Sequence, residues 1–114
     1  MTDARRALGA AGEEAVARWY LDNGYRILAR NWRCRQGELD VIAGKGDLLA
    51  FCEVKTRSSD AFGSPFEAVT AAKRARIRRL AMAWLEESGM RADELRFDVA
   101  GVMGGVVEVL TAAF

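Results

Sequence analysis

The chain contains no histidine, and this absence is the most informative feature of its composition. Without an imidazole there is no Ser-His-Asp or Cys-His nucleophile system, no histidine-dependent nuclease or phosphotransferase, and none of the usual zinc hydrolases. Any catalysis must therefore use carboxylates, lysine, arginine, hydroxyls or a bound cation.

Cysteine and long apolar segments are also scarce. The two cysteines, Cys34 and Cys52, lack the paired spacing of a zinc site and cannot form a disulfide framework. The chain begins with MTDARRALGAAGEE, which is not an apolar run, and no apolar stretch approaches ~20 residues. We therefore expect a cytoplasmic protein with neither a secretory signal nor a membrane span.

The net charge is too small to indicate a partner. The 114 residues include 17 basic and 16 acidic side chains, which leaves a net charge of +1, and 51% of the residues are apolar. A chain of this length and composition is expected to form one domain, residues 1–114, with its own core. Nearly all the basic residues are arginine, which favours phosphate binding only weakly because a GC-rich genome also enriches arginine.

Two apolar segments joined by a turn signal, residues 38–43 and 48–56, are predicted to form a β-hairpin. The Gly-Asp pair at residues 46–47 suits a two-residue hairpin turn. With that turn, the register places Asp40 opposite Glu53, on the same face of the hairpin. The other side chains are largely apolar on both faces, which is typical of a central, covered part of a sheet.

Glu38 and Lys55 form another pair in this register and share the face of Asp40 and Glu53. The ordinary interpretation is a solvated face with weak cross-strand ion pairs. However, Asp40 opposite Glu53 is a like-charge pair, which is unfavourable unless a positive group lies between them. Hard cations such as Mg²⁺ prefer carboxylate oxygens and keep waters for exchange with phosphate. The pattern therefore predicts a Mg²⁺ (or Mn²⁺) site, beside which Lys55 could hold an attacking water.

Asp40 followed by Glu53-Val54-Lys55 resembles the D...(D/E)xK signature of the restriction-endonuclease-like nucleases, a superfamily that includes Holliday junction resolvases. That short pattern arises easily by chance. A longer set of strings, in order and spacing, resembles the YraN family of small bacterial proteins over nearly the whole chain. The strings are Gly37-Glu38-Leu39-Asp40, Phe51-Cys52-Glu53-Val54-Lys55-Thr56-Arg57, Phe62-Gly63, and Glu67-Ala68-Val69-Thr70 with Lys73.

The resemblance implies a metal-dependent nuclease that hydrolyses phosphodiester bonds in nucleic acid, with DNA favoured over RNA and branched DNA as one candidate substrate. In such a site Asp40, Glu53 and the backbone carbonyl of Val54 would hold one or two Mg²⁺ ions, and Lys55 would orient the attacking water.

An acidic residue of the first helix completes the site in this resemblance. Alignment through Gly9 and Gly12 selects Glu13 as the further catalytic residue, whereas alignment through Ala17 and Leu21 selects Glu14. Both assignments stay open on the sequence alone.

Phosphate contacts are expected from a basic loop after the first strand and from the start of the second long helix. In the loop, Trp32 either stacks on a base or covers the edge of the sheet with the arginines solvated around it. The candidate nucleic-acid-binding residues are Arg33, Arg35, Arg57, Lys73 and Arg74.

The order of elements predicts an α/β domain with a central mixed sheet flanked by helices, in the restriction-endonuclease-like order α-β-β-β-α-β-β. Asp98 is expected to be structural and to accept hydrogen bonds from a neighbouring loop. The second helix starts either after a capping box at Ser64 or after Thr70. The expected elements are helix 3–23, strand 25–31, the hairpin strands, a helix ending near residue 87, and strands 95–102 and 106–110.

Two other functions compete with catalysis. A binding module that keeps the nuclease-like fold would need the same basic surface without cutting nucleic acid. An interaction domain would use the apolar C-terminal hairpin, whose edge strand could pair with a second copy to form a homodimer.

Overall fold

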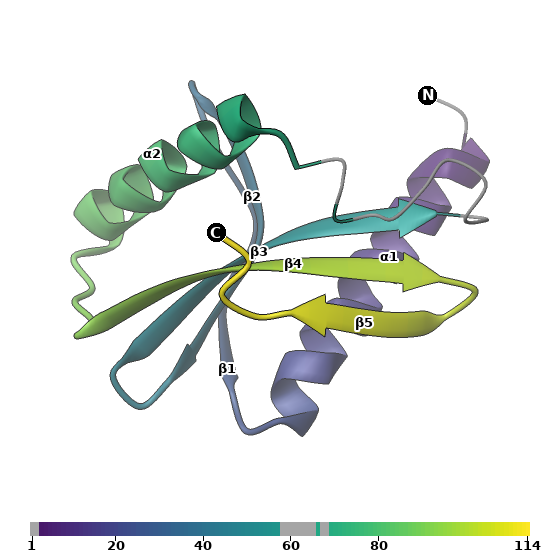
Figure 1. Cartoon of the computed structure of the whole chain (residues 1–114), viewed down its shortest axis with the longest axis horizontal. Coiled ribbons are helices and arrows are strands. Elements are labelled where there is room, and N and C mark those ends of the chain that lie inside the picture. Colours follow the sequence, from purple (N-terminus) through teal and green to yellow (C-terminus); the bar gives the residue numbers. More distant parts are fainter. Residues whose placement is uncertain (1–2, 58–65, 67–68) are drawn as a thin grey trace.

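One five-stranded mixed sheet with a helix on each face forms the protein in the computed structural model (Figure 1). The structure describes residues 3–57, 66 and 69–114, apart from the side chain of Arg5. The elements are α1 (Asp3–Asp22), β1 (Arg26–Cys34), β2 (Gly37–Lys45), β3 (Leu48–Arg57), α2 (Ala71–Ser88), β4 (Glu94–Met103) and β5 (Val106–Leu110). The predicted order α-β-β-β-α-β-β is confirmed, as is the α/β class.

The strands lie in the sheet in the same order as in the sequence, from β1 to β5. β3 and β4 pair in parallel, whereas the other neighbours are antiparallel. A parallel pair needs a long crossover, and α2 lies in the connection between β3 and β4. The sheet is therefore mixed, as predicted.

Apolar side chains cover both faces of the sheet, which confirms that the hairpin is central and buried. On the face of α1, the buried residues are Val16, Tyr20, Val41, Ala43, Ala50, Cys52, Ala100 and Val102. On the face of α2, they include Leu39, Ile42, Phe51, Ile77, Leu80, Ala81, Trp84, Phe97 and Val99. Both layers between the sheet and the helices are therefore built mainly from apolar side chains.

α2 has recognisable signals at both ends. Thr70 is its N-cap and accepts a hydrogen bond from the backbone N–H of Lys73, while Gly89 adopts the left-handed conformation at the C-terminal end. Thr70 is therefore the start of this helix. The alternative capping box at Ser64 lies outside the described residues, as do Phe62-Gly63 and Glu67-Ala68 of the motif strings.

The first strand is longer than predicted. It was expected to end at Asn31 and to lead into a basic loop, but β1 continues to Cys34, and Arg33 pairs with Glu38 of β2. The physical reason is an alternation of core-facing and exposed side chains, which is hard to see in the sequence because the exposed positions are arginines. Trp32 and Cys34 pack against the core on the α2 face, while Arg33 between them is exposed.

Asp98 has the structural role that its position predicted. It is buried and accepts hydrogen bonds from the Tyr20 hydroxyl, the Arg96 guanidinium and the backbone N–H of Ala112. These bonds connect α1, β4 and the segment that follows β5. The carboxylate thus joins parts of the chain that lie far apart in sequence.

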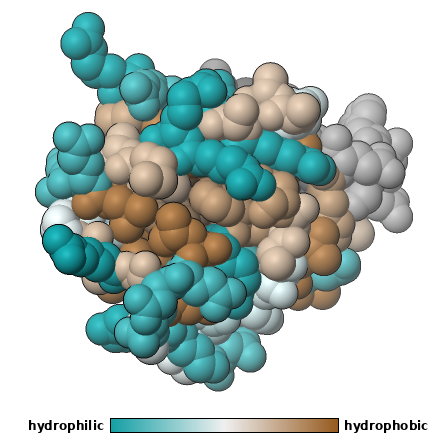
Figure 2. All heavy atoms as spheres, turned by 60° about the vertical axis from the view of Figure 1, so that its left-hand side comes forward, coloured by the Kyte–Doolittle hydropathy of each residue, from teal (hydrophilic) through white to brown (hydrophobic). Residues whose placement is uncertain are grey.

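β5 forms one edge of the sheet and carries exposed apolar side chains. Val106 and Leu110 of β5 are 71% and 46% exposed, and Met103 at the end of the neighbouring β4 is 40% exposed. Figure 2 shows hydrophobic residues between hydrophilic ones on another side of the surface. Pairing of this edge with a second copy remains a prediction. In the part of the chain that the structure describes, no helix combines the length and apolar character needed to cross a membrane.

Candidate functional site

The hydrogen-bonded ladder between β2 and β3 stops in the middle of the sheet. The predicted register is confirmed from Lys45–Leu48 to Val41–Cys52. The expected pairs of Asp40 with Glu53 and of Glu38 with Lys55 were wrong as ladder pairs, because they lie beyond its end. There the Asp40 side chain takes the place of a backbone acceptor, and its Oδ2 accepts a 2.8 Å hydrogen bond from the N–H of Val54.

Three carboxylates gather beyond the end of the β2–β3 ladder. One oxygen each from Glu13, Glu38 and Asp40 lies within 4.8 Å of the others. Glu13 comes from α1, while Glu38 and Asp40 come from β2. All three side chains are half-buried, so their mutual repulsion is screened less than that of carboxylates in open water.

A close approach of α1 to β3 places Glu13 in this group. A Cβ at Gly12 would overlap Thr56 Oγ1 and would lie 3.1 Å from Thr56 Cβ and Cγ2. Only glycine lets the helix sit this close to the strand. The next residue, Glu14, instead forms a 2.7 Å ion pair with Arg30. Of the two acidic residues that the sequence left open, Glu13 is the one beside Asp40.

Glu53 belongs to a second, adjoining group that contains two lysines. Its Oε1 lies 3.4 Å from Lys55 Nζ and 3.2 Å from Lys73 Nζ, and its side chain is only 12% exposed. Lys55 is on the same strand, whereas Lys73 reaches Glu53 from the first turn of α2. α1 and α2 thus both contribute a charged side chain to this end of the sheet.

The electrostatics of the two groups are coupled. Burial, and next the charge of Glu53, raise the pKa of Asp40 to about 7. Burial also raises the pKa of Glu13, with Glu38 as the next cause. Burial, followed by the contact with Lys73, lowers the pKa of Lys55. Burial is thus the main cause of all three shifts, and repulsion between neighbouring carboxylates adds to the shifts of Asp40 and Glu13.

The structure therefore brings together Asp40, Glu53, Lys55 and Glu13, the four residues predicted to be catalytic. The predicted metal ligands were Asp40, Glu53 and the carbonyl of Val54. The tightest carboxylate group differs from that set, because Glu38 is in it and Glu53 pairs with lysines. Glu38 was recognised on the polar face of the hairpin but not as a site residue, although it lies within the Gly37–Asp40 string.

Asn31 is a residue that sequence reasoning missed altogether. Its amide, oriented so that the NH₂ group faces the acidic residues, donates to Glu13 and Glu38. Nothing in the periodicity of the chain signals this role.

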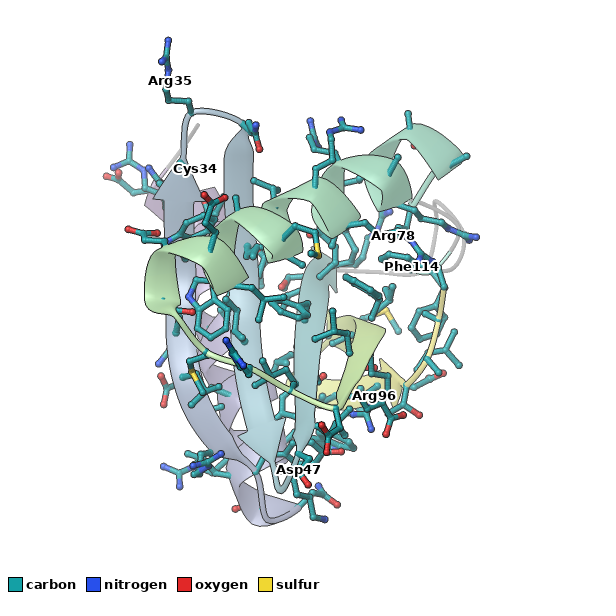
Figure 3. All side chains as sticks on the ribbon, turned by 90° about the vertical axis from the view of Figure 1, so that its left-hand side faces the viewer. Cys34, Arg35, Asp47, Arg78, Arg96 and Phe114 are labelled. Atoms are coloured by element: carbon teal, nitrogen blue, oxygen red, sulfur yellow. The ribbon has the colours of Figure 1, made fainter. Side chains whose placement is uncertain are left out.

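The predicted phosphate contacts are dispersed. Arg33 lies beside the site and forms a 2.9 Å ion pair with Glu38. Arg35 sits at the tip of the β1–β2 turn and extends away from the body of the protein (Figure 3). Arg57 is the last residue of β3, and Lys73 contacts Glu53.

Arg74 and Trp32, which were also considered as nucleic-acid contacts, have structural partners as well. Arg74 donates to the carbonyl of Val69 and lies over the ring of Phe114, which Arg78 also covers (Figure 3). Trp32 packs against the core and donates its indole N–H to Glu87, so the structure favours its role as a cover of the sheet over base stacking.

Comparison with known proteins decides the family. The model described as "Uncharacterised protein family UPF0102" matches residues 12–102, which is most of the chain. The chain belongs to this family. The UPF0102 protein of Nocardia farcinica is 56% identical over 99 residues, which are 87% of this chain and 78% of that protein. The UPF0102 protein of Moorella thermoacetica is 46% identical over an alignment of 121 residues that covers both chains in full.

Membership of UPF0102 confirms the resemblance to YraN proteins. The matched range begins at Gly12, so it includes Glu13, and it extends through both hairpin strands and α2 to Val102 in β4. All the carboxylates and lysines of the site therefore lie inside the range that the family model matches.

Proposed function

We propose that this UPF0102 protein is a metal-dependent phosphodiesterase that acts on nucleic acid, with DNA favoured over RNA. The observation that carries the proposal is the convergence of Glu13, Glu38 and Asp40 within 4.8 Å of one another, next to Glu53 and Lys55. The resemblance of Asp40 and Glu53-Val54-Lys55 to a nuclease signature supports the reaction class.

The donor set fits a hard divalent cation. All the candidate ligands are carboxylate oxygens, which suit Mg²⁺ or Mn²⁺ and not a metal that prefers nitrogen or sulfur. Four carboxylates meet two lysines here, so a bound cation would relieve repulsion that the protein alone leaves in place. Glu13, Glu38 and Asp40 would hold the ion. The nuclease signature implies that Glu53 and the Val54 carbonyl are ligands as well.

A bound Mg²⁺ would supply a water of lowered pKa and would offset the charge of the scissile phosphate. The protein's own groups would do the rest. Lys55, which lies 3.4 Å from Glu53, would hold this water and orient it for attack on the phosphorus. Lys73, whose pKa is raised because its contacts with Lys55 and Glu53 outweigh its burial, would stay protonated and face the phosphate.

Metal binding is the first test, because it does not require the substrate to be known. Calorimetric titration with Mn²⁺ and Mg²⁺ should show binding to the wild type and a loss of at least roughly tenfold in affinity for Glu13→Gln. Glu14→Gln is the matched control, since it changes the neighbouring side chain that pairs with Arg30, and should bind as the wild type does. Absence of binding to the wild type at millimolar metal would argue against the proposal.

Cleavage is the second test. Branched, nicked and single-stranded DNA, with the same strands in RNA, should be screened in Mg²⁺ for phosphodiester hydrolysis. Asp40→Asn and Lys55→Ala should each abolish cleavage while keeping the fold. If metal and nucleic acid bind but no substrate is cut, the protein is a binding module with a nuclease-like fold. Undiminished cleavage by either variant would refute the assigned roles.

A further inference from the structure

Asn31 has an unusual backbone conformation in the interior of a strand. Its φ is +51°, and the other described non-glycine residue with positive φ is Ala112, which follows β5. Asparagine tolerates this left-handed region better than most residues, but the conformation still has an energetic cost. A strand residue retains such a conformation when its surroundings require it.

The neighbours of Asn31 show what this conformation does. Residues two apart in a regular strand point to the same face of the sheet. Arg30 pairs with Glu14 of α1, whereas Trp32, two residues later, packs in the core on the face of α2. The left-handed residue turns the strand between them, and the Asn31 side chain points toward the carboxylates at the end of the sheet.

The Asn31 amide connects two acidic side chains that come from different elements. Its NH₂ group donates to Glu13 Oε2 and, at 3.0 Å, to Glu38 Oε1. This orientation is the one that places the donor against the carboxylates, because the opposite orientation would direct the amide oxygen at them. One neutral group thus satisfies one oxygen on each of two repelling carboxylates.

We propose that Asn31 is a positioning residue that holds Glu13 and Glu38 at the spacing needed to bind one divalent cation together. The inference rests on the proposed function. A neutral donor suits this task, because it fixes one oxygen of each carboxylate and adds no positive charge that would compete with the cation. Arg33 forms an ion pair with the other oxygen of Glu38, Oε2, but its side chain is 77% exposed, so this pair holds Glu38 only weakly.

The variant Asn31→Gly removes the side-chain amide but keeps the left-handed backbone, so it separates the effects of these two features on metal binding. Glycine accepts a positive φ without strain, so the variant should fold with a melting temperature close to that of the wild type. Because it lacks the amide, its Kd for Mn²⁺, measured by electron paramagnetic resonance of the free ion, should rise at least roughly tenfold. Asn31→Ala should show the same loss of affinity together with a lower melting temperature, since alanine is strained at this φ.

Asn23→Gly is the matched control. Asn23 lies just after α1, and its amide donates to the carbonyl of Trp19, away from the carboxylates. This variant should bind Mn²⁺ as the wild type does. An effect on the Asn31 variants alone would assign the loss to the amide at the site, because both glycine substitutions remove the same side chain.

Three results would overturn the inference. If folded Asn31→Gly and Asn31→Ala bind Mn²⁺ as tightly as the wild type, Asn31 does not position the ligands, and the proposed function stands. If both variants fail to fold, the residue serves the fold instead. If the wild type itself binds no Mn²⁺, the proposed function fails and this inference fails with it.

Discussion

Replacing Gly12 with alanine is the sharpest test of how the fold places Glu13. The new Cβ would overlap Thr56 Oγ1 and would lie 3.1 Å from two further carbons of that side chain. Overpacking of this kind costs about 1–3 kcal/mol, and alanine recovers about 1 kcal/mol through its higher helix propensity. We therefore expect Gly12→Ala to lower the free energy of unfolding by up to about 2 kcal/mol and to move α1 away from β3.

Gly9 provides a matched control three residues earlier in the same helix. Nothing lies within 4 Å of a Cβ built there, so Gly9→Ala should gain up to about 1 kcal/mol of stability from helix propensity alone. The two variants should thus shift the urea midpoint in opposite directions. Only Gly12→Ala should also weaken Mn²⁺ binding, because only that substitution displaces Glu13.

A second substitution should rescue the first. Thr56→Ala removes Oγ1 and Cγ2, two of the three atoms that the new Cβ would meet, and the remaining contact at 3.1 Å needs only a small adjustment. The double variant should recover more than half of the stability that Gly12→Ala loses. If Gly12→Ala is as stable as Gly9→Ala, or if Thr56→Ala gives no recovery, the close approach of α1 to β3 does not set the position of Glu13.

Three further predictions concern buried charges. Burial raises the pKa of Asp40 from 3.8 to about 7, so the folded state holds this proton more tightly than the unfolded chain does, and ionisation destabilises the fold as pH rises between these values. Asp40→Asn should therefore become more stable than the metal-free wild type by an amount that grows from pH 4 to pH 7, up to about 4 kcal/mol, in urea denaturation at several pH values. A constant difference would contradict this prediction. Binding of Mg²⁺ near pH 6 should release the proton of Asp40. Calorimetry in two buffers with different ionisation enthalpies would detect this release as a difference in the apparent binding enthalpy. An equal apparent enthalpy in both buffers would contradict the prediction. Asp98→Ala should lose about 3–5 kcal/mol in thermal or urea unfolding, because it leaves the Arg96 guanidinium, the Tyr20 hydroxyl and the Ala112 N–H without their acceptor. The exposed Asp93→Ala serves as its control, and a comparable loss there would refute the argument.

Local sequence signals predicted the elements and part of their pairing. The turn at Gly46, whose φ is +57°, fixes the hairpin, and from it the register could be counted correctly as far as Val41–Cys52. Apolar periodicity placed α1, α2 and the last two strands close to their observed bounds. These features depend on residues that are near one another in the chain, so a pattern can show them.

The site's details depend on contacts between distant residues. Counting the register from the turn could not predict the hydrogen bond from the Val54 N–H to the Asp40 side chain, because that bond forms only where β2 and β3 separate. The extension of β1 and the left-handed Asn31 were missed for the same reason, since both serve the junction with α1 and β2. The choice of Glu13 over Glu14 likewise required the contact between Gly12 and Thr56.

The place where the β2–β3 ladder stops explains why the charges collect there. β1 and β2 continue to pair as far as Cys34–Gly37, and β3 and β4 as far as Arg57–Met103, but β2 and β3 separate after Val41–Cys52 (Figure 1). A buried sheet that continued across this point would have no room for carboxylates. Because the two strand pairs diverge, the carboxylates of each pair face the opening, and α1 and α2 can supply Glu13 and Lys73 to it. Continued pairing would satisfy more backbone groups, so the chain gives up strand hydrogen bonds where these carboxylates and lysines meet.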